Sequence, residues 1–140
     1  MTRSPTTAVS PAKFIGEKNE SFTIIKGDLN QENLSWVDSL PGSLDACIHT
    51  AGVVHAYNIN EFYRVNTDGT SHLINNLKKK FTHLKFVLIS SLAAAGPALD
   101  KNKRAEGELD FPISIYGRSK KQAEEVGGVG CDFANSIRRL

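Results

Sequence analysis

Two stretches, FVLISS at residues 86–91 and YGRSK at residues 116–120, decide how the rest of this chain is interpreted. The first is a continuous apolar run that ends in two serines, which is typical of a strand buried on both faces of a parallel sheet. Parallel sheets place their chemistry beyond the carboxyl ends of their strands, so Ser90 and Ser91 are expected at the mouth of a site. The sequence therefore predicts an α/β fold whose site begins where this strand ends.

Tyr116 and Lys120 lie four residues apart in a segment, residues 115–125, whose pattern predicts a helix. That spacing places the phenol and the ammonium on one helix face. A free tyrosine has a pKa of about 10, and a nearby ammonium favours the phenolate. With a serine hydroxyl from the strand end, these groups would hold a substrate hydroxyl or carbonyl while its proton moves to or from the tyrosine. Taken alone, the same spacing also fits a solvated helix face.

The ordered set of Ser91, Tyr116 and Lys120, with SSLAAAGP at residues 90–97, resembles the extended short-chain dehydrogenases/reductases, the NAD-dependent epimerase/dehydratase family. The resemblance implies a Rossmann-like doubly wound parallel sheet and NAD or NADP as the hydride carrier. It implies Tyr116 as general acid/base, Lys120 as the residue that lowers the tyrosine pKa and binds ribose hydroxyls, and Ser91 as the residue that orients the substrate. Ser90 is expected to line the nicotinamide pocket.

A short β-branched run at residues 22–26 predicts a further strand, and Gly27-Asp28-Leu29 follows it as a turn. In the family that the chain resembles, an aspartate and an aliphatic residue at this point flank the adenine. The resemblance therefore implies that Asp28 and Leu29 bind the cofactor. Asp28 also fits as the N-cap of a helix over residues 30–37, so both interpretations stay open.

Another predicted strand, residues 44–49, runs into Thr50, Ala51 and Gly52. Small residues at the end of a strand allow the backbone to approach a ligand closely. The family carries an Ala-Gly pair here, and its backbone lies along the ribose and phosphates of the cofactor. The resemblance makes these three residues candidate cofactor contacts, and a plain turn glycine is the alternative for Gly52.

Residues 59–80 form the longest helical pattern, with apolar residues at helical spacing that predict burial against the sheet. Within it, NTDGT at residues 66–70 resembles the Asn-x-x-Gly-Thr signature of the family. In that signature the asparagine braces the neighbouring strands and the cofactor site, which makes Asn66 a supporting candidate. Gly69 has a sufficient explanation in close helix packing alone.

The chain contains no glycine-rich phosphate loop of the GxxGxxG type, with which the family normally opens. We therefore expect an internal portion, truncated at both ends, that lacks the first two strands with their loop and the C-terminal substrate domain. Residues 1–20 are expected to be a loop or disordered lead, residues 21–125 a partial NAD(P)-binding Rossmann domain, and residues 126–140 an atypical Gly-rich tail without a further strand. We expect a short parallel sheet centred on residues 44–49. The strand at residues 22–26 would pair with residues 44–49, pair with another chain, or stay displaced with unpaired backbone groups.

The composition of the 140 residues, 40% hydrophobic and 23% charged, is ordinary for one globular domain. A net charge of +2 without a basic face argues against a nucleic-acid partner. No apolar run reaches the length of a membrane span and no secretory signal is recognisable, so the expected location is cytoplasmic. Cys47 and Cys131 lack the spacing of metal ligands, and no metal is expected.

These observations predict an NAD(P)-dependent oxidoreductase, epimerase or dehydratase that acts on a nucleotide sugar or on a hydroxy or keto substrate. A small-molecule substrate is the expected partner, and a homodimer is left open. The alternative function is a non-catalytic fragment or pseudoenzyme binding module without cofactor affinity. Retention of Ser91, Tyr116 and Lys120 favours the enzyme, whereas the missing phosphate loop favours the alternative and predicts that the isolated chain is inactive.

Overall fold

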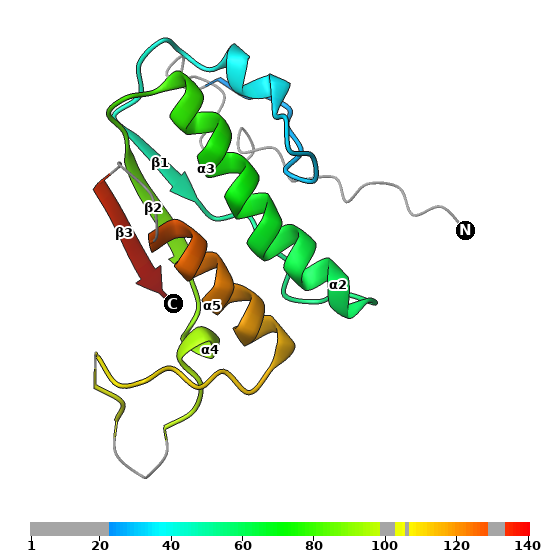
Figure 1. Ribbon diagram of the computed structural model, residues 1–140, viewed down its shortest axis with the longest axis vertical. Coiled ribbons are helices and arrows are strands. Elements are labelled where there is room, and N and C mark those ends of the chain that lie inside the picture. The colour runs from blue at the N-terminus through cyan, green and yellow to red at the C-terminus, as the bar shows by residue number, and fades with distance from the viewer. Residues whose placement is uncertain (1–22, 99–102, 106, 129–133) are drawn as a thin grey trace, which may run out of the picture.

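The computed structural model describes residues 23–98, 103–105, 107–128 and 134–140. In this part of the chain the strands form one parallel sheet in the order β1-β2-β3 (Figure 1). The strands are β1 (Ala46–His49), β2 (Lys85–Ser90) and β3 (Ala134–Arg139).

The central strand is β2, since it pairs with both other strands. Phe86 lies opposite Cys47 of β1, and Leu88 lies opposite Ile137 of β3. Successive side chains of a strand point to opposite faces of the sheet. Phe86 and Leu88 point to the same face, and they are 1% and 0% exposed. The apolar run that the sequence analysis starts from is therefore the middle of the core.

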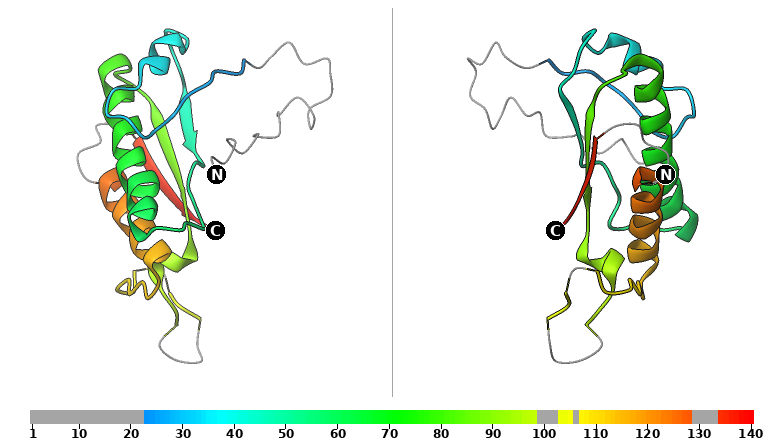
Figure 2. Two further views of the ribbon diagram at one scale, coloured as in Figure 1. Left: turned by 90° about the vertical axis from the view of Figure 1, so that its right-hand side faces the viewer. Right: turned by 60° about the vertical axis from the view of Figure 1, so that its left-hand side comes forward.

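The helices connect the strands and lie mainly on one side of the sheet. Helix α3 and helix α5 cover one face of the sheet, as both views in Figure 2 show. Phe86 and Leu88 belong to the same core cluster as residues of these two helices. Leu73, Ile74 and Leu77 of α3 supply the apolar stripe, and Ala123 supplies the contact from α5. The helical elements are η1 (Ser35–Ser39), α2 (Ile59–Phe62), η2 (Tyr63–Asp68), α3 (Gly69–Lys80), α4 (Leu92–Ala95) and α5 (Ile115–Gly128).

The opposite face of the sheet carries no helix among the described residues (Figure 2). Ile48 of β1 points to this face and is 65% exposed, whereas Val87 and Ile89 of β2 are half-buried. A two-layer arrangement of a parallel sheet and helices confirms the predicted α/β class.

The long helical pattern at residues 59–80 is confirmed, with one interruption that the sequence does not signal. Between α2 and α3 the chain forms the π-helix η2, in which the Gly69 N–H donates to the carbonyl of Arg64, five residues earlier. A π-turn contains one residue more than an α-turn, and such turns are frequent at functional sites. The turn carries the candidate Asn66.

The strand predicted at residues 22–26 is wrong for the described residues 23–26, which form no secondary structure. A strand exists only if its backbone groups pair with a neighbour, and Ile24 remains 58% exposed. The prediction that residues 44–49 form the centre of the sheet is also wrong, because β1 is an edge strand. The lead at residues 1–20 lies outside the described residues.

A third strand lies where the sequence analysis predicts none. β3 occupies the last part of the segment treated as a Gly-rich tail, and α5 continues to Gly128, beyond the expected end at residue 125. The sequence ANSIRR of β3 has no apolar run to signal a strand. Ile137 packs against the core, and Arg139 binds the carboxylate of Glu124 in α5. These contacts with distant residues stabilise the strand, which the local sequence does not predict.

Candidate active site

The two serines at the end of β2 have different environments. The Ser91 hydroxyl accepts a hydrogen bond of 3.3 Å from the N–H of Ala93 and so caps the N-terminus of α4. The hydroxyl oxygen of Ser90 is buried and has no hydrogen-bond partner within the described part of the chain. A buried hydroxyl without a partner is unfavourable, so an atom of a bound molecule beside Ser90 would satisfy it.

Lys120 lies beside these serines, although it comes from α5. Its side chain is 4% exposed, and its Nζ donates to the carbonyl oxygen of Ile89 at 2.8 Å. Burial lowers the pKa of Lys120, while the charge of Glu124 opposes that shift. An ammonium has three N–H donors, and the Ile89 carbonyl takes one of them. Lys120 is therefore fixed at the carboxyl end of β2 and retains donor capacity.

Tyr116 lies one turn before Lys120, in the first turn of α5. Its ring is half-buried and lies 6.3 Å from the ring of Phe62, measured between centroids, with a tilt of 59°. The two aromatic rings at this separation support each other. The helix spacing predicted from the sequence is confirmed, and it places Tyr116 and Lys120 on one side of α5.

Asn66 joins this helix to the end of β1. Its Oδ1 accepts from the N–H of Val53 at 2.8 Å, and its Nδ2 donates to the Val53 carbonyl at 3.1 Å and to the Ser119 hydroxyl at 2.9 Å. Ser119 in turn donates to the carbonyl of Tyr116 at 2.8 Å. The predicted bracing role of Asn66 therefore has a geometric basis, and Ser119 belongs to the same network.

Gly52 lies against this network. A Cβ atom at that position would lie 3.1 Å from the Asn66 Oδ1 and 3.9 Å from the Lys120 Nζ. The lysine therefore reaches the backbone that follows β1, where Thr50, Ala51 and Gly52 are exposed. Three of the predicted groups, the end of β1, Asn66 and Lys120, meet in one corner of the molecule.

His49, the last residue of β1, is a buried member of this network. Its Nε2 lies 3.0 Å from the hydroxyl oxygen of Thr70, and that hydroxyl donates to the Asn66 carbonyl at 2.6 Å. Because the single hydroxyl proton is used, His49 must donate from Nε2. Burial, with a smaller contribution from the charge of Lys120, lowers the pKa of His49 to about 4. The imidazole is therefore neutral at pH 7.

Two candidates lie outside this corner. The Asp28 carboxylate is exposed and accepts hydrogen bonds from the backbone and side chain of Asn30. Leu29 packs on Gly69, where an added Cβ would lie 3.2 Å from the leucine Cβ. The prediction that Asp28 caps a helix over residues 30–37 is wrong, because η1 begins at Ser35 and Leu34 is its N-cap residue. The adenine-binding role of Asp28 and Leu29 stays a prediction.

Sequence reasoning missed Ser119 and the network role of His49. Ser119 stands inside the YGRSK motif, directly before Lys120, and a serine with 0% exposure in a helix requires a hydrogen-bond partner. His49 carries no local signal, because its partner Thr70 lies 21 residues away in the sequence.

No helix within the described residues is both long and apolar enough to cross a membrane.

The residues of the corner fit a ligand with hydroxyl or amide groups, such as the dinucleotide that the resemblance implies. The fit rests on the unsatisfied Ser90 hydroxyl, the remaining donors of Lys120 and the exposed backbone at Gly52. Together they offer hydrogen-bond donors and an uncovered backbone within one small region.

Comparisons with known proteins identify the family and the fold of the chain. The model of an NAD-binding family described as Male sterility protein matches residues 6–128. UDP-glucuronic acid 4-epimerase from Bacillus cereus, solved with NAD, superposes with a TM-score of 0.74 over 91% of this chain at 22% identity. RMD from Pseudomonas aeruginosa, solved with NADPH, superposes with a TM-score of 0.72 over 80% of this chain at 26% identity. These similarities confirm the Rossmann-like fold.

The chain spans only part of its relatives. It covers 41% of the epimerase chain and 41% of the RMD chain. The uncharacterized protein y4nL of Sinorhizobium fredii is 32% identical over 113 residues, which make up 78% of this chain and 31% of y4nL.

Proposed function

Since this chain belongs to the NAD-binding Male sterility protein family, within the extended short-chain dehydrogenases/reductases, we propose that it carries the proton-transfer side of an NAD(P)-dependent oxidoreductase site. Tyr116 is the general acid/base, Lys120 favours its phenolate, and Ser91 orients the substrate. When bound, NAD or NADP supplies the hydride acceptor or donor. Thr50, Ala51, Gly52 and Ser90 contact the cofactor, with Asp28 and Leu29 at its adenine end and Asn66 as the brace.

One observation carries the proposal. Lys120 is buried and bound to the Ile89 carbonyl at the carboxyl end of β2, one helical turn after Tyr116. Burial disfavours the charge of an ammonium, so a buried lysine is unfavourable unless neighbouring groups interact with that charge. Here the charge lies one helical turn after the phenol of Tyr116, and a positive charge at that point favours the oxygen anion that the phenol forms when it gives up its proton.

The protein residues account for the movement of one proton. A substrate hydroxyl placed between Ser91 and Tyr116 would pass its proton to the phenol oxygen, and in the reverse direction a substrate carbonyl would receive the proton of the phenol. Ser91 would have to give up its weak bond to the Ala93 N–H or share its hydroxyl between both partners. The hydroxyl has two acceptor sites and one donor, so sharing is chemically available.

The family and its solved relatives support a small-molecule substrate. The relatives include MoeE5, solved with UDP-glucuronic acid and NAD, which is 27% identical over 81% of this chain. We therefore propose a nucleotide sugar or another hydroxy or keto compound as the substrate of the whole protein.

Tyr116→Phe tests the mechanism. Activity is measured in a chimera in which this chain replaces the matched region of Pseudomonas aeruginosa RMD, so that a phosphate loop and a substrate domain are present. The substitution removes the transferable proton and little volume, so turnover should be abolished while cofactor binding is spared. Lys120→Ala should weaken both turnover and binding. Turnover of Tyr116→Phe within about tenfold of the parent chimera would remove the tyrosine from the mechanism.

A further inference from the structure

The segment that leads into the helix of Tyr116 is bound to the rest of the molecule by backbone and side-chain contacts. We refer to residues 107–112 as the strap. Leu109 and Phe111 of the strap are 93% and 66% exposed, whereas Asp110 between them points inward. The N–H of Phe111 donates to the carbonyl of Ala95 at 2.7 Å, and a Cβ at Gly96 would lie 2.0 Å from the Phe111 carbonyl oxygen. The strap therefore lies directly on the end of α4.

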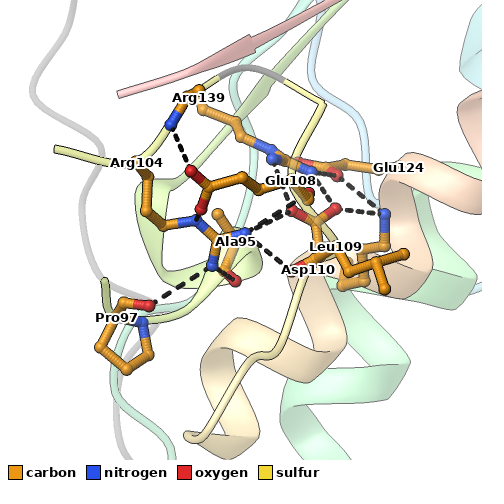
Figure 3. Close-up of polar contacts among 10 residues, drawn as sticks. Ala95, Pro97, Arg104, Glu108, Leu109, Asp110, Glu124 and Arg139 are labelled. Atoms are coloured by element: carbon orange, nitrogen blue, oxygen red, sulfur yellow. Dashed lines mark hydrogen bonds and ion pairs between the residues drawn. The ribbon is translucent and has the colours of Figure 1, made fainter. Parts of the chain in front are cut away.

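A compact charge cluster joins the strap to α5 and to the end of β3 (Figure 3). Arg139 donates to both carboxylate oxygens of Asp110, at 2.9 and 2.6 Å, and to both carboxylate oxygens of Glu124, at 2.8 and 2.6 Å. Bidentate pairs of this kind have a fixed orientation. The Nζ of Lys121 adds a bond of 2.6 Å to Asp110. The members of this cluster, which we name the clamp, are Asp110, Lys121, Glu124 and Arg139.

The side chains of the clamp stabilise one another's charged forms. Hydrogen bonds from Arg139 and, to a smaller extent, from Lys121 lower the pKa of Asp110 to about 2, although burial opposes the shift. The same carboxylates raise the pKa of Arg139. Glu124 is buried, and an unpaired buried carboxylate would be strongly unfavourable. Each charge of the clamp therefore needs the others.

The clamp lies at one end of the proposed catalytic elements. Lys121 directly follows Lys120, and after the strap the hydroxyl of Ser114 accepts from the N–H of Gly117 at 2.9 Å and starts the helix that carries Tyr116. A cavity of about 940 Å³ opens between the strap, α4 and β3, with Leu92 and the clamp residues in its wall. Leu92 follows Ser91, so the cavity begins next to the proposed site.

We propose that the clamp fixes the strap against α5 and β3, and that it thereby sets the position of Tyr116 at the start of the helix. Its four members are positioning residues, and the catalytic consequence rests on the proposed function. Without the clamp the strap would be tied to α4 by the Phe111 bond and by Arg104, which donates to the carbonyls of Ala95 and Leu109.

Amide hydrogen exchange on this chain tests the structural half of the proposal. Arg139→Gln and the shape-preserving Asp110→Asn should each accelerate exchange at the N–H of Phe111 and of Gly117 by about tenfold more than at the core N–H of Leu88. Arg138→Gln is the matched control, because this neighbouring arginine is exposed, and it should change neither. A variant that unfolds raises exchange at Phe111 and at Leu88 alike, so the test uses the variant in which the N–H of Leu88 keeps its wild-type rate. An unchanged rate at Phe111 in that variant would overturn the proposal.

The chimera tests the catalytic half. Asp110→Asn should lower kcat with an unchanged KM for NADPH, because no residue of the strap belongs to the proposed cofactor contacts. Faster exchange with an unchanged kcat would show that the clamp holds the strap without positioning Tyr116, which overturns that half. Full turnover of Tyr116→Phe would instead overturn the proposed function and leave the exchange result to decide the structural half.

Discussion

The two sides of α5 are fixed by different kinds of interaction. Toward η2 and the end of β2, Ser119 and Lys120 are buried and bind neutral partners, the Asn66 amide of η2 and the Ile89 carbonyl of β2. Toward β3, Lys121 and Glu124 belong to the clamp, whose side chains other than Glu124 keep part of their surface in solvent. Adjacent residues of one helix therefore serve two different networks.

The two networks differ in how they respond to a substitution and to a change of pH or salt. The buried network around Asn66 is sensitive to the loss of one atom, because the remaining partner has no water to replace it. The clamp is a partly exposed charge cluster, so it responds to salt, which screens its charges, and to acid, which removes them. The η2 side is therefore suited to fix the proposed catalytic residues, and the β3 side is suited to hold the strap.

The largest expected loss of stability comes from a substitution that disturbs both sides of α5 together. Gly117 lies where α5 crosses α4, and a Cβ there would lie 2.2 Å from the Ala93 carbonyl oxygen. Gly117→Ala would force the start of α5 away from α4, so we expect a loss of about 3 kcal/mol or more in the free energy of unfolding. Urea unfolding measures it.

Gly128→Ala is the matched control for this prediction. It lies at the other end of α5, and an added Cβ would meet no atom within 4 Å. Alanine is the better helix former, so this variant should gain about 0.5 to 1 kcal/mol. A Gly117→Ala variant as stable as Gly128→Ala would show that α4 does not constrain α5.

The second prediction concerns how the stability contributed by each of the two sides of α5 depends on pH. The pKa of His49 in the fold is about 4, below its ordinary 6.5, so the unfolded chain binds the proton more readily. The contribution of His49 should be complete above pH 6.5 and should fall as the pH drops toward 4. The pKa of Asp110 is about 2 in the fold, below its ordinary 3.8, so the clamp contribution should persist until about pH 4 and fall toward pH 2.

Urea midpoints measured between pH 7 and pH 2.5 test these windows. The charged groups around each site are Lys120 for His49, and Arg139, Lys121 and Arg104 for Asp110. His49→Gln should flatten the upper window and leave the lower one, and Asp110→Asn should do the reverse. Equal slopes in the wild-type chain and in both variants would contradict the separation.

The smallest effect is expected from one hydroxyl in the buried network. Ser119→Ala removes the acceptor of one Asn66 N–H, so it should lower the free energy of unfolding by about 1 to 2 kcal/mol. Ser71→Ala is the control, since that hydroxyl makes only a long, exposed contact of 3.5 Å with Asn75, and it should stay within about 0.5 kcal/mol. Equal losses in the two variants would mean that burial of the network adds nothing.

Much of the fold could be predicted from local patterns. The apolar run of β2 and the spacing of Tyr116 and Lys120 signal their own structure, because strand burial and helix faces depend on neighbouring residues. β3 could not be predicted, since its sequence is polar and its strand conformation follows from pairing with β2. Two further features could not be predicted from the local sequence: the contact of Lys120 with Ile89, and the clamp. Each joins residues that lie 11 to 31 positions apart.

The π-turn η2 adds a constraint on how this chain could have changed over time. Each residue of an α-helix rotates the next by about 100°, so one extra residue in a turn rotates everything that follows by that amount. With the extra residue, Asn66 faces α5 while Leu73, Ile74 and Leu77 face the sheet. Removing a single residue here would turn one of these two sets away from its partner. Relatives that keep both contacts should therefore keep the length of this segment, whatever residues fill it.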